Sequence, residues 1–279
     1  MSDPLPPGLY IVATPIGNLG DITMRAADTL RGAALILAED KRVSAKLLAH
    51  VGAKAPMVAY HDHSNDSTRL RIVAEAAAKP VALISDAGTP LISDPGYKLV
   101  RAVREAGVAV HTLPGPCAAI AALTLAALPT DRFLFAGFLP AKAKARAETI
   151  AELAGLRTTL VFYESGPRLG ESLAALAAGL SPRDAAVIRE ISKLHEDTVT
   201  GTLPALAERY ADQPPRGEIV IVIGPPGEVA EASDEALDAA LRDALATLSP
   251  SRAAAEVAAL LGVPKKRAYA RALALADLR

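Results

Sequence analysis

The segment that constrains the fold most is an apolar run, residues 81–84 (VALI), followed by the loop SDAGTPLISDPG, residues 85–96. Four apolar residues bounded by turn formers are typical of a buried strand, and a helix is predicted over residues 97–106. In open α/β sheets ligands bind at the carboxyl ends of the strands, which is where Asp86 lies. Gly88 would let the backbone approach a flat ligand closely. Taken alone, the segment is equally compatible with a connecting loop that binds nothing.

The same alternation of apolar run, loop and helix recurs along residues 1–128 and predicts a parallel sheet with helices on both faces. Strands outnumber helices in residues 129–228, which favours a mixed sheet there. Residues 234–279 are predicted to be a small helical tail. The fold class is therefore α/β, with two α/β subdomains and a tail. The predicted strands are residues 9–13, 35–38, 57–60, 81–84, 108–113, 133–138, 158–163, 185–190, 198–202 and 218–223.

Composition is ordinary for a globular protein, with 51% apolar and 22% charged residues in 279. The net charge of −1 gives no overall basic field, so contacts with nucleic acid would have to come from local patches. A single cysteine, Cys117, excludes an intrachain disulfide and favours a reducing compartment. No signal peptide is visible, and the most apolar segment, residues 118–128, is too short to span a bilayer. We expect a cytoplasmic protein without a membrane anchor.

Two common types of site are disfavoured. The first loop, TPIGNLGD (residues 14–21), contains neither G-x-G-x-x-G nor a Walker lysine, which argues against a dinucleotide or a triphosphate. His61, Asp62 and His63 have the residue types of a metal site, but no convincing further ligand accompanies them. No metal is predicted.

Two charged segments leave alternatives open. The run Glu39-Asp40-Lys41-Arg42 ends the second strand, and it is either a solvated loop or a substrate-facing cluster. Residues 249–279 are predicted to form a helix-turn-helix, with six basic and two acidic residues. This tail is either a capping pair of helices or a nucleic-acid contact.

Nine segments in a fixed order over residues 9–224 resemble the tetrapyrrole methylase superfamily of S-adenosylmethionine-dependent methyltransferases. The first loop lacks the multi-glycine sequence of corrin- and sirohaem-forming relatives. It therefore resembles the branch that methylates a ribose 2′-oxygen of 16S ribosomal RNA. The segments are LYIVATPIGNLGDIT, AEDKR, AYHDH, SDAGTPLISDPG, LPGPCAAIAAL, FLFAGFLP, LVFYESGPRL, REISKLHED and GEIVIVIG.

The resemblance implies that S-adenosylmethionine binds in a cleft between the two subdomains of a homodimer. It also implies that the substrate is a cytidine in the 16S RNA of the small ribosomal subunit. The cofactor would be held by the first loop, the central loop, the turn after the fifth strand and the second subdomain. The matching residues are Ile16, Asp86, Ala87, Gly88, Thr89, Cys117, Ala118, Phe162, Tyr163, Arg189 and Glu190.

Catalysis would require a base, because a ribose hydroxyl is a poor nucleophile and removal of its proton accelerates transfer by about 10²–10⁴-fold. The candidates are Glu39, Asp40, Asp86 and His195, and Lys41 if burial suppresses its charge. We favour Glu39, Asp40 and Lys41 as the catalytic group, either for substrate positioning or for proton handling.

Two other functions are weighed against this one. A methyltransferase acting on a small corrin-type tetrapyrrole would need an apolar trough and no basic tail. The basic tail and the stretch from Lys142 to Arg146 favour RNA instead. A non-catalytic RNA-binding protein of the same fold is disfavoured by the intact cofactor loop.

Overall fold

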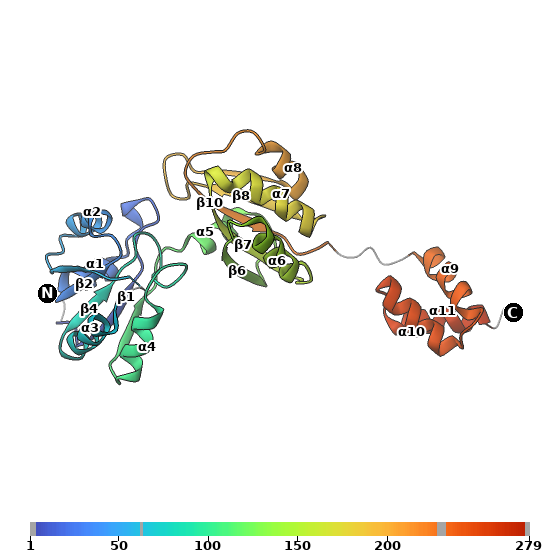
Figure 1. Cartoon of the computed structure of the whole chain (residues 1–279), viewed down its shortest axis with the longest axis horizontal. Helices are drawn as coiled ribbons and strands as arrows, with labels where there is room; N and C mark the ends of the chain where they lie inside the picture. Colours follow the sequence, from blue (N-terminus) through green and yellow to red (C-terminus); the bar gives the residue numbers. More distant parts are fainter. Residues whose placement is uncertain (1–3, 62–63, 228–232, 277–279) are drawn as a thin grey trace. The chain divides into compact units, whose positions relative to one another are not determined.

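The computed structural model describes residues 4–61, 64–227 and 233–276. The chain divides into two compact units, residues 1–225 and 226–279. The first unit contains two five-stranded sheets, and the second is helical (Figure 1). No helix among the described residues is long and apolar enough to cross a membrane.

The first sheet is entirely parallel, with strand order β3-β2-β4-β1-β5. Its central strands are apolar at every position, because helices cover both faces and each residue is buried on one side or the other. The parallel sheet predicted from the sequence is confirmed. The strands are β1 (Gly8–Val12), β2 (Leu35–Ala38), β3 (Met57–Ala59), β4 (Pro80–Leu83) and β5 (Val110–Leu113).

Two separate cores form on the two faces of this sheet. On one face Tyr10 and Val12 of β1 pack with helices α1 and α2, and on the other Leu9 and Ile11 pack with α3 and α4. This alternation follows from the strand period of two residues. The helices are α1 (Met24–Gly32), α2 (Lys41–Val51), α3 (Asp66–Ala78) and α4 (Tyr97–Glu105).

Side chains in the loops fix where these helices begin. The Thr23 hydroxyl accepts a hydrogen bond from the Ala26 N–H at 3.1 Å and caps α1, while Asp21 lies in the short helix η1 (Leu19–Asp21). Asp40 caps α2 by accepting from the Arg42 N–H at 2.8 Å. Such caps satisfy N–H groups that have no partner within the helix.

The second sheet is mixed, with strand order β6-β7-β10-β8-β9. Strands β6 and β7 pair in parallel and the other neighbours are antiparallel. The mixed sheet predicted for this part of the chain is confirmed. The strands are β6 (Phe133–Phe138), β7 (Thr159–Ser165), β8 (Asp184–Arg189), β9 (Asp197–Thr202) and β10 (Glu218–Ile223).

Helices cover the two faces of the second sheet unequally. Phe162 of β7 packs into the core formed with α6, α7 and α8, whereas Val161 and Tyr163 face α5 on the opposite side. A short helix, η2, joins β7 to α7. The elements are α5 (Ala118–Leu125), α6 (Ala143–Ala154), η2 (Gly166–Arg168), α7 (Leu169–Leu180) and α8 (Leu203–Arg209).

The second unit is a bundle of α9 (Asp234–Leu245), α10 (Pro250–Leu261) and α11 (Lys265–Ala276). Gly262, with φ +66°, ends α10 in the left-handed conformation, and α11 begins three residues later. The predicted helical tail is confirmed. The predicted tail residues Asp277 and Arg279 lie outside the described residues, as do Asp62 and His63.

Ion pairs bind α11 to α9. Arg267 contacts Asp234 at 2.8 Å, and Arg271 makes two hydrogen bonds to Asp238, at 2.8 and 2.5 Å. The hydrogen bond from Arg267 lowers the pKa of Asp234, and the hydrogen bonds from Arg271 lower the pKa of Asp238. Two of the basic side chains counted in the tail are therefore used inside the bundle.

Candidate functional site

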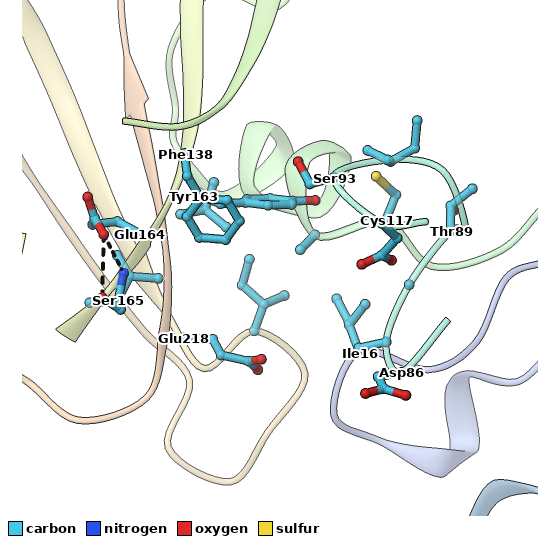
Figure 2. A pocket seen from close by; sticks show the side chains of 18 of the residues that line it. Ile16, Asp86, Thr89, Ser93, Cys117, Phe138, Tyr163, Glu164, Ser165 and Glu218 are labelled. Carbon is cyan, nitrogen blue, oxygen red and sulfur yellow. Dashed lines mark hydrogen bonds between the residues drawn. The ribbon is translucent and has the colours of Figure 1, made fainter. Parts of the chain in front are cut away.

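A cavity of about 470 Å³ lies between the two sheets of the first unit, among loops that follow the strand ends. Figure 2 shows Tyr163 and Phe138 on one side and Ile16, Thr89 and Cys117 on the other. Its lining residues are Ile16, Glu39, Asp86, Ala87, Gly88, Thr89, Ile92, Ser93, Asp94, Cys117, Ala118, Phe138, Tyr163, Glu164, Ser165, Ile191, Lys193, Gly217, Glu218, Ile219 and Val220.

The first loop and the central loop are bonded to each other at this cavity. Thr14 and Gly88 exchange two backbone hydrogen bonds, at 2.8 and 3.0 Å, and the buried Thr14 hydroxyl also donates to the carbonyls of Ser85 and Gly88. Gly88 has φ +80°, a conformation that L side chains rarely adopt. A Cβ there would lie 3.4 Å from the Ile16 side chain, so the two loops are closely packed where they line the cavity.

The turn before α5 forms another side of the cavity. The Thr89 hydroxyl donates to the Pro116 carbonyl at 2.9 Å, which ties the central loop to the turn. The Tyr163 hydroxyl accepts from the Ala119 N–H at 3.2 Å, in the first turn of α5. The Tyr163 ring stands edge-on to Phe135 and Phe138. Burial raises the pKa of Tyr163, so its hydroxyl stays protonated.

A turn after β8 lies across the first loop. Ser192 donates a hydrogen bond to Asp21, and a Cβ on Gly17 would come within 2.4 Å of the Lys193 side chain. Lys193 pairs with Glu190 at 2.8 Å and with Glu218 at 2.6 Å. Burial lowers the pKa of Lys193, but these two hydrogen-bonded carboxylates outweigh burial and raise it.

Backbone strain is concentrated beside the cavity. Five residues other than glycine have positive φ in the described ranges, and four of them lie on loops at the cavity. They are Leu91 (φ +76°), Ser93 (φ +61°), Glu190 (φ +52°) and Ser192 (φ +66°). Strained backbone of this kind persists where surrounding structure holds it and is common at functional sites.

Carboxylates from two loops face the cavity. Asp86 accepts a hydrogen bond from the Asp40 N–H at 3.0 Å and so connects the central loop to the loop after β2. Asp94 is half-buried. Burial raises its pKa to about 6, a hydrogen bond with Ser85 opposes the rise, and the charges of Glu39 and Asp86 add to it.

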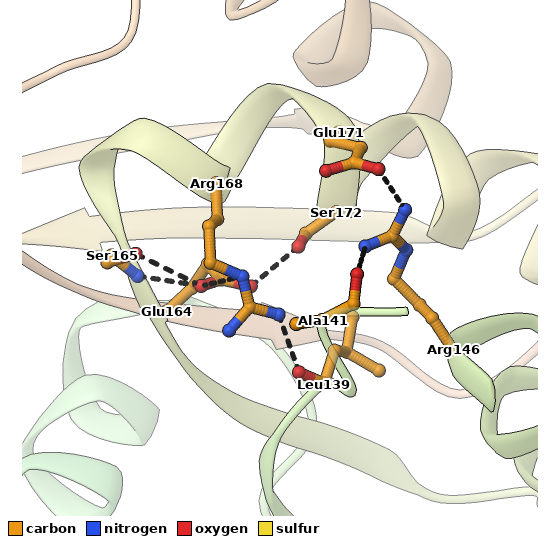
Figure 3. A network of polar contacts seen from close by, with 8 residues as sticks. All are labelled: Leu139, Ala141, Arg146, Glu164, Ser165, Arg168, Glu171 and Ser172. Atoms are coloured by element: carbon orange, nitrogen blue, oxygen red, sulfur yellow. Dashed lines mark hydrogen bonds and ion pairs between the residues drawn. The ribbon is translucent and has the colours of Figure 1, made fainter. Parts of the chain in front are cut away.

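A buried polar network supports the wall formed by β7 (Figure 3). The Glu164 carboxylate accepts from the Ser165 N–H at 2.8 Å and from the Ser172 hydroxyl at 2.5 Å, and Arg168 lies 3.6 Å away. Arg168 in turn donates to the Leu139 carbonyl at 2.6 Å. The network fixes Ser165, a lining residue, and the loop after β6 to the same carboxylate.

Arg146 has a different role from the one predicted for the basic stretch of residues 142–146. Its guanidinium is buried, pairs with Glu171 and donates to the Ala141 carbonyl. It therefore stabilises the start of α6 and is not available to RNA. Lys142 and Lys144 of the same stretch are exposed.

The cavity brings together most of the residues predicted to bind the cofactor, along with Glu39 from the predicted catalytic group. Ile16, Asp86, Ala87, Gly88, Thr89, Cys117, Ala118 and Tyr163 all line it. Phe162 does not, because its side chain points to the opposite face of β7. Arg189 and Glu190 flank the cavity without lining it, and Arg189 donates to the Arg216 carbonyl.

The other predicted catalytic residues do not line the cavity. Asp40 bonds the Arg42 side chain and backbone N–H, which lowers the pKa of Asp40 to about 2, so it is a poor base. Lys41 is the exposed first residue of α2, and His195 is exposed in the turn after β8.

Several lining residues were not predicted. Asp94 lies within the central segment, yet its sequence context identifies only a turn. Lys193 occurs in the REISKLHED segment, where the spacing gives no sign that the turn crosses the first loop. The unpredicted lining residues are Ile92, Ser93, Asp94, Phe138, Glu164, Ser165, Ile191, Lys193, Gly217, Glu218, Ile219 and Val220.

Comparison of the sequence with known protein families shows to which family the chain belongs. Residues 8–207 match the family described as Tetrapyrrole (Corrin/Porphyrin) Methylases. The chain belongs to the tetrapyrrole methylase family. Residues 231–276 match a second family, described as the RsmI C-terminal HTH domain.

Among the tetrapyrrole methylases, relatives named ribosomal RNA small subunit methyltransferase I are similar over nearly the whole chain. The protein from Erythrobacter litoralis is 54% identical over 274 residues, covering 98% of this chain and 97% of that protein. The Mesorhizobium japonicum protein is 46% identical over 277 residues, covering 98% and 94%. The predicted ribosomal RNA branch of the family is confirmed.

Solved structures of other proteins share the fold. Diphthine synthase aligns with a TM-score of 0.62 and 15% identity, covering 77% of this chain and 89% of that one. Uroporphyrin-III C-methyltransferase from Thermus thermophilus, complexed with S-adenosyl homocysteine, aligns with a TM-score of 0.53 and 22% identity, covering 78% and 97%. At these identities the likeness concerns the fold.

Proposed function

We propose that this protein is an S-adenosylmethionine-dependent methyltransferase that modifies the ribose 2′-oxygen of a cytidine in 16S RNA of the small ribosomal subunit. The observation that carries the proposal is the 45–54% identity to proteins named ribosomal RNA small subunit methyltransferase I, over nearly the whole chain. It acts in the cytoplasm as a homodimer. Analytical ultracentrifugation tests the homodimer, which should sediment with twice the mass of the chain.

The cavity fits the cofactor chemically. Its volume of about 470 Å³ is within the usual range for small-molecule sites, roughly 300–1,000 Å³. Ile16, Ala87 and Ala118 offer apolar surface to an adenosine ring. Gly88 has no side chain, so the ring can approach the backbone closely there. The carboxylates of Asp86 and Glu39 suit the positive charges of the sulfonium and the ammonium.

The bound cofactor supplies a methyl group already activated by the sulfonium charge. The protein's own contribution is alignment and proton removal. Loops braced by the Thr14–Gly88 bridge and the Glu164 network hold the cavity walls in fixed positions, and alignment of this kind supplies up to roughly 7–11 kcal/mol. The raised pKa of Tyr163 keeps its hydroxyl neutral beside the cavity.

Labelled methyl transfer tests the function. Small subunits from a strain lacking this protein, incubated with the enzyme and methyl-labelled S-adenosylmethionine, should yield labelled 2′-O-methylcytidine in 16S RNA. Subunits from the parent strain, already modified, should accept no label. Labelling of a precorrin-like tetrapyrrole, with none of subunits or free RNA, would contradict the proposal and favour the small-molecule branch.

The tail is proposed to contact RNA phosphates through Lys265 and Lys266. Both are exposed at the start of α11, and neither forms an ion pair within the described part of the chain, in contrast to Arg267 and Arg271. A helix start that carries two lysines in a helix-turn-helix is well placed to meet a phosphate backbone.

Replacing Lys265 and Lys266 together with alanine should weaken binding to small subunits and reduce the salt dependence of log Kd by about 2, one per phosphate contact. S-adenosylmethionine affinity should not change. The matched control replaces Lys46 and Lys54, two exposed lysines of the first unit, and should leave the salt slope unaltered. Equal slopes for both double variants would exclude this contact.

A further inference from the structure

Five carboxylates line the cavity, and three of them are committed to structural bonds. Glu164 accepts hydrogen bonds from two groups in its buried network. Glu218 pairs with Lys193, and Asp86 accepts from the Asp40 backbone N–H. These bonds hold the three carboxylates in fixed positions in the wall of the cavity. Of the other two lining carboxylates, Glu39 and Asp94, Asp94 belongs to the central loop and lies near the charges of Glu39 and Asp86.

Asp94 is held rigidly where the central loop turns back. The preceding residue, Ser93, has φ +61°, and Pro95 follows, so the backbone on both sides is restricted. Gly96, with φ +135°, packs so closely that a Cβ would lie 2.9 Å from Leu83. A hydrogen bond with Ser85 orients the Asp94 side chain. These constraints give Asp94 the fixed placement that a catalytic group requires.

We propose that Asp94 is the general base of the methyl transfer, an inference that rests on the proposed function. The Asp94 carboxylate takes the proton of the ribose 2′-hydroxyl while the 2′-oxygen lone pair forms the new bond to the methyl carbon. The carbon–sulfur bond breaks with its electrons going to sulfur, which becomes a neutral thioether. The proton then leaves Asp94 for water.

The surroundings of Asp94 support this role. Burial raises the pKa of Asp94 to about 6, and the charges of Glu39 and Asp86 contribute in the same direction. Burial and, to a smaller extent, the charge of Asp94 raise the pKa of Tyr163. Its hydroxyl therefore stays protonated and cannot accept the proton of the ribose hydroxyl. Lys193 is bound by Glu190 and Glu218. At pH 7–8 Asp94 is thus ionised and more basic than an ordinary carboxylate, which favours general-base catalysis.

The first test is Asp94→Asn, which keeps the size and shape of the side chain but replaces the basic carboxylate with an amide. Single-turnover methyl transfer to small subunits should fall by about 10²–10⁴-fold, and the rise in wild-type rate around pH 6 should disappear. Affinity for S-adenosylhomocysteine, measured by calorimetry, should stay within threefold. Formate should partly restore transfer by Asp94→Ala. The matched control, Asp28→Asn, replaces an exposed aspartate of α1 and should retain the wild-type rate and pH profile.

A second readout needs neither cofactor nor substrate. The folded protein keeps the Asp94 proton between about pH 4 and 6 while the unfolded chain loses it, so this residue lowers stability as pH rises through that window. Asp94→Asn should therefore melt roughly 2–4 °C above wild type at pH 8 and show no such gain at pH 4.

The outcomes separate the two proposals. A wild-type enzyme that transfers no methyl group to subunits would remove the proposed function itself. With an active wild type, a variant rate within fivefold of normal would overturn the role of Asp94. A loss of S-adenosylhomocysteine affinity as large as the loss of rate would also overturn it, because Asp94 would then be a cofactor-holding residue. An equal melting temperature for both proteins at pH 8 would contradict the burial on which the assignment depends.

Discussion

Gly166→Ala is expected to lower the free energy of unfolding by about 3 kcal/mol or more. Gly166 begins η2, directly after β7, and a Cβ there would stand 1.7 Å from the Pro215 carbonyl oxygen. Since the obstructing atom belongs to the backbone, the segment before β10 would have to move as a whole. That segment leads into Gly217 and Glu218 at the cavity, so methyl transfer should also fall.

Chemical denaturation measures the effect of Gly166→Ala. The control is Gly155→Ala, at the end of α6, where an added Cβ would meet nothing within 4 Å and the backbone is right-handed. That variant should unfold within about 0.5 kcal/mol of wild type. If both variants shifted the midpoint equally, the close approach of the two segments would be disproved.

Glu164→Ala should cost about 3–5 kcal/mol, the usual penalty for breaking a buried charged network on one side. The change leaves the Ser165 N–H and the buried Ser172 hydroxyl without their acceptor, and it removes the partner of Arg168. Because Arg168 also holds the Leu139 carbonyl, the loop after β6 should loosen together with the cavity wall.

Urea unfolding of Glu164→Ala should be compared with Glu148→Ala. Glu148 is exposed on α6 and lies 3.9 Å from Lys144, a surface pair worth little. The control should change stability by less than about 0.5 kcal/mol. A loss below about 1 kcal/mol for Glu164→Ala would mean that water replaces the network at little cost.

The fold was predictable because its main signals are local. Strands such as residues 81–84 appear as apolar runs, and loops such as residues 85–96 and 114–116 contain several glycines and prolines. The position of the site followed from a general rule of open α/β sheets, since Asp86 and Gly88 lie directly beyond a strand. Both remain cavity residues in the structure.

Side-chain direction and long-range partners were not predictable in the same way. Phe162 and Tyr163 are neighbours in a strand buried on both faces, so apolar character alone cannot tell which of them faces the cavity. Arg146 is basic in a basic stretch, and its partner Glu171 is 25 residues away. Asp40 belongs to a run of charges, but its role as the cap of α2 turned it toward Arg42.

The interior position of β1 in the first sheet, between β4 and β5, has a consequence for synthesis on the ribosome. β1 pairs with β4 and β5, so its neighbours emerge only after residue 79 has been made. At about 5–20 residues per second, this apolar strand leaves the ribosome several seconds before either partner. During that interval both edges of β1 lack their partner strands and are open to pairing with other chains.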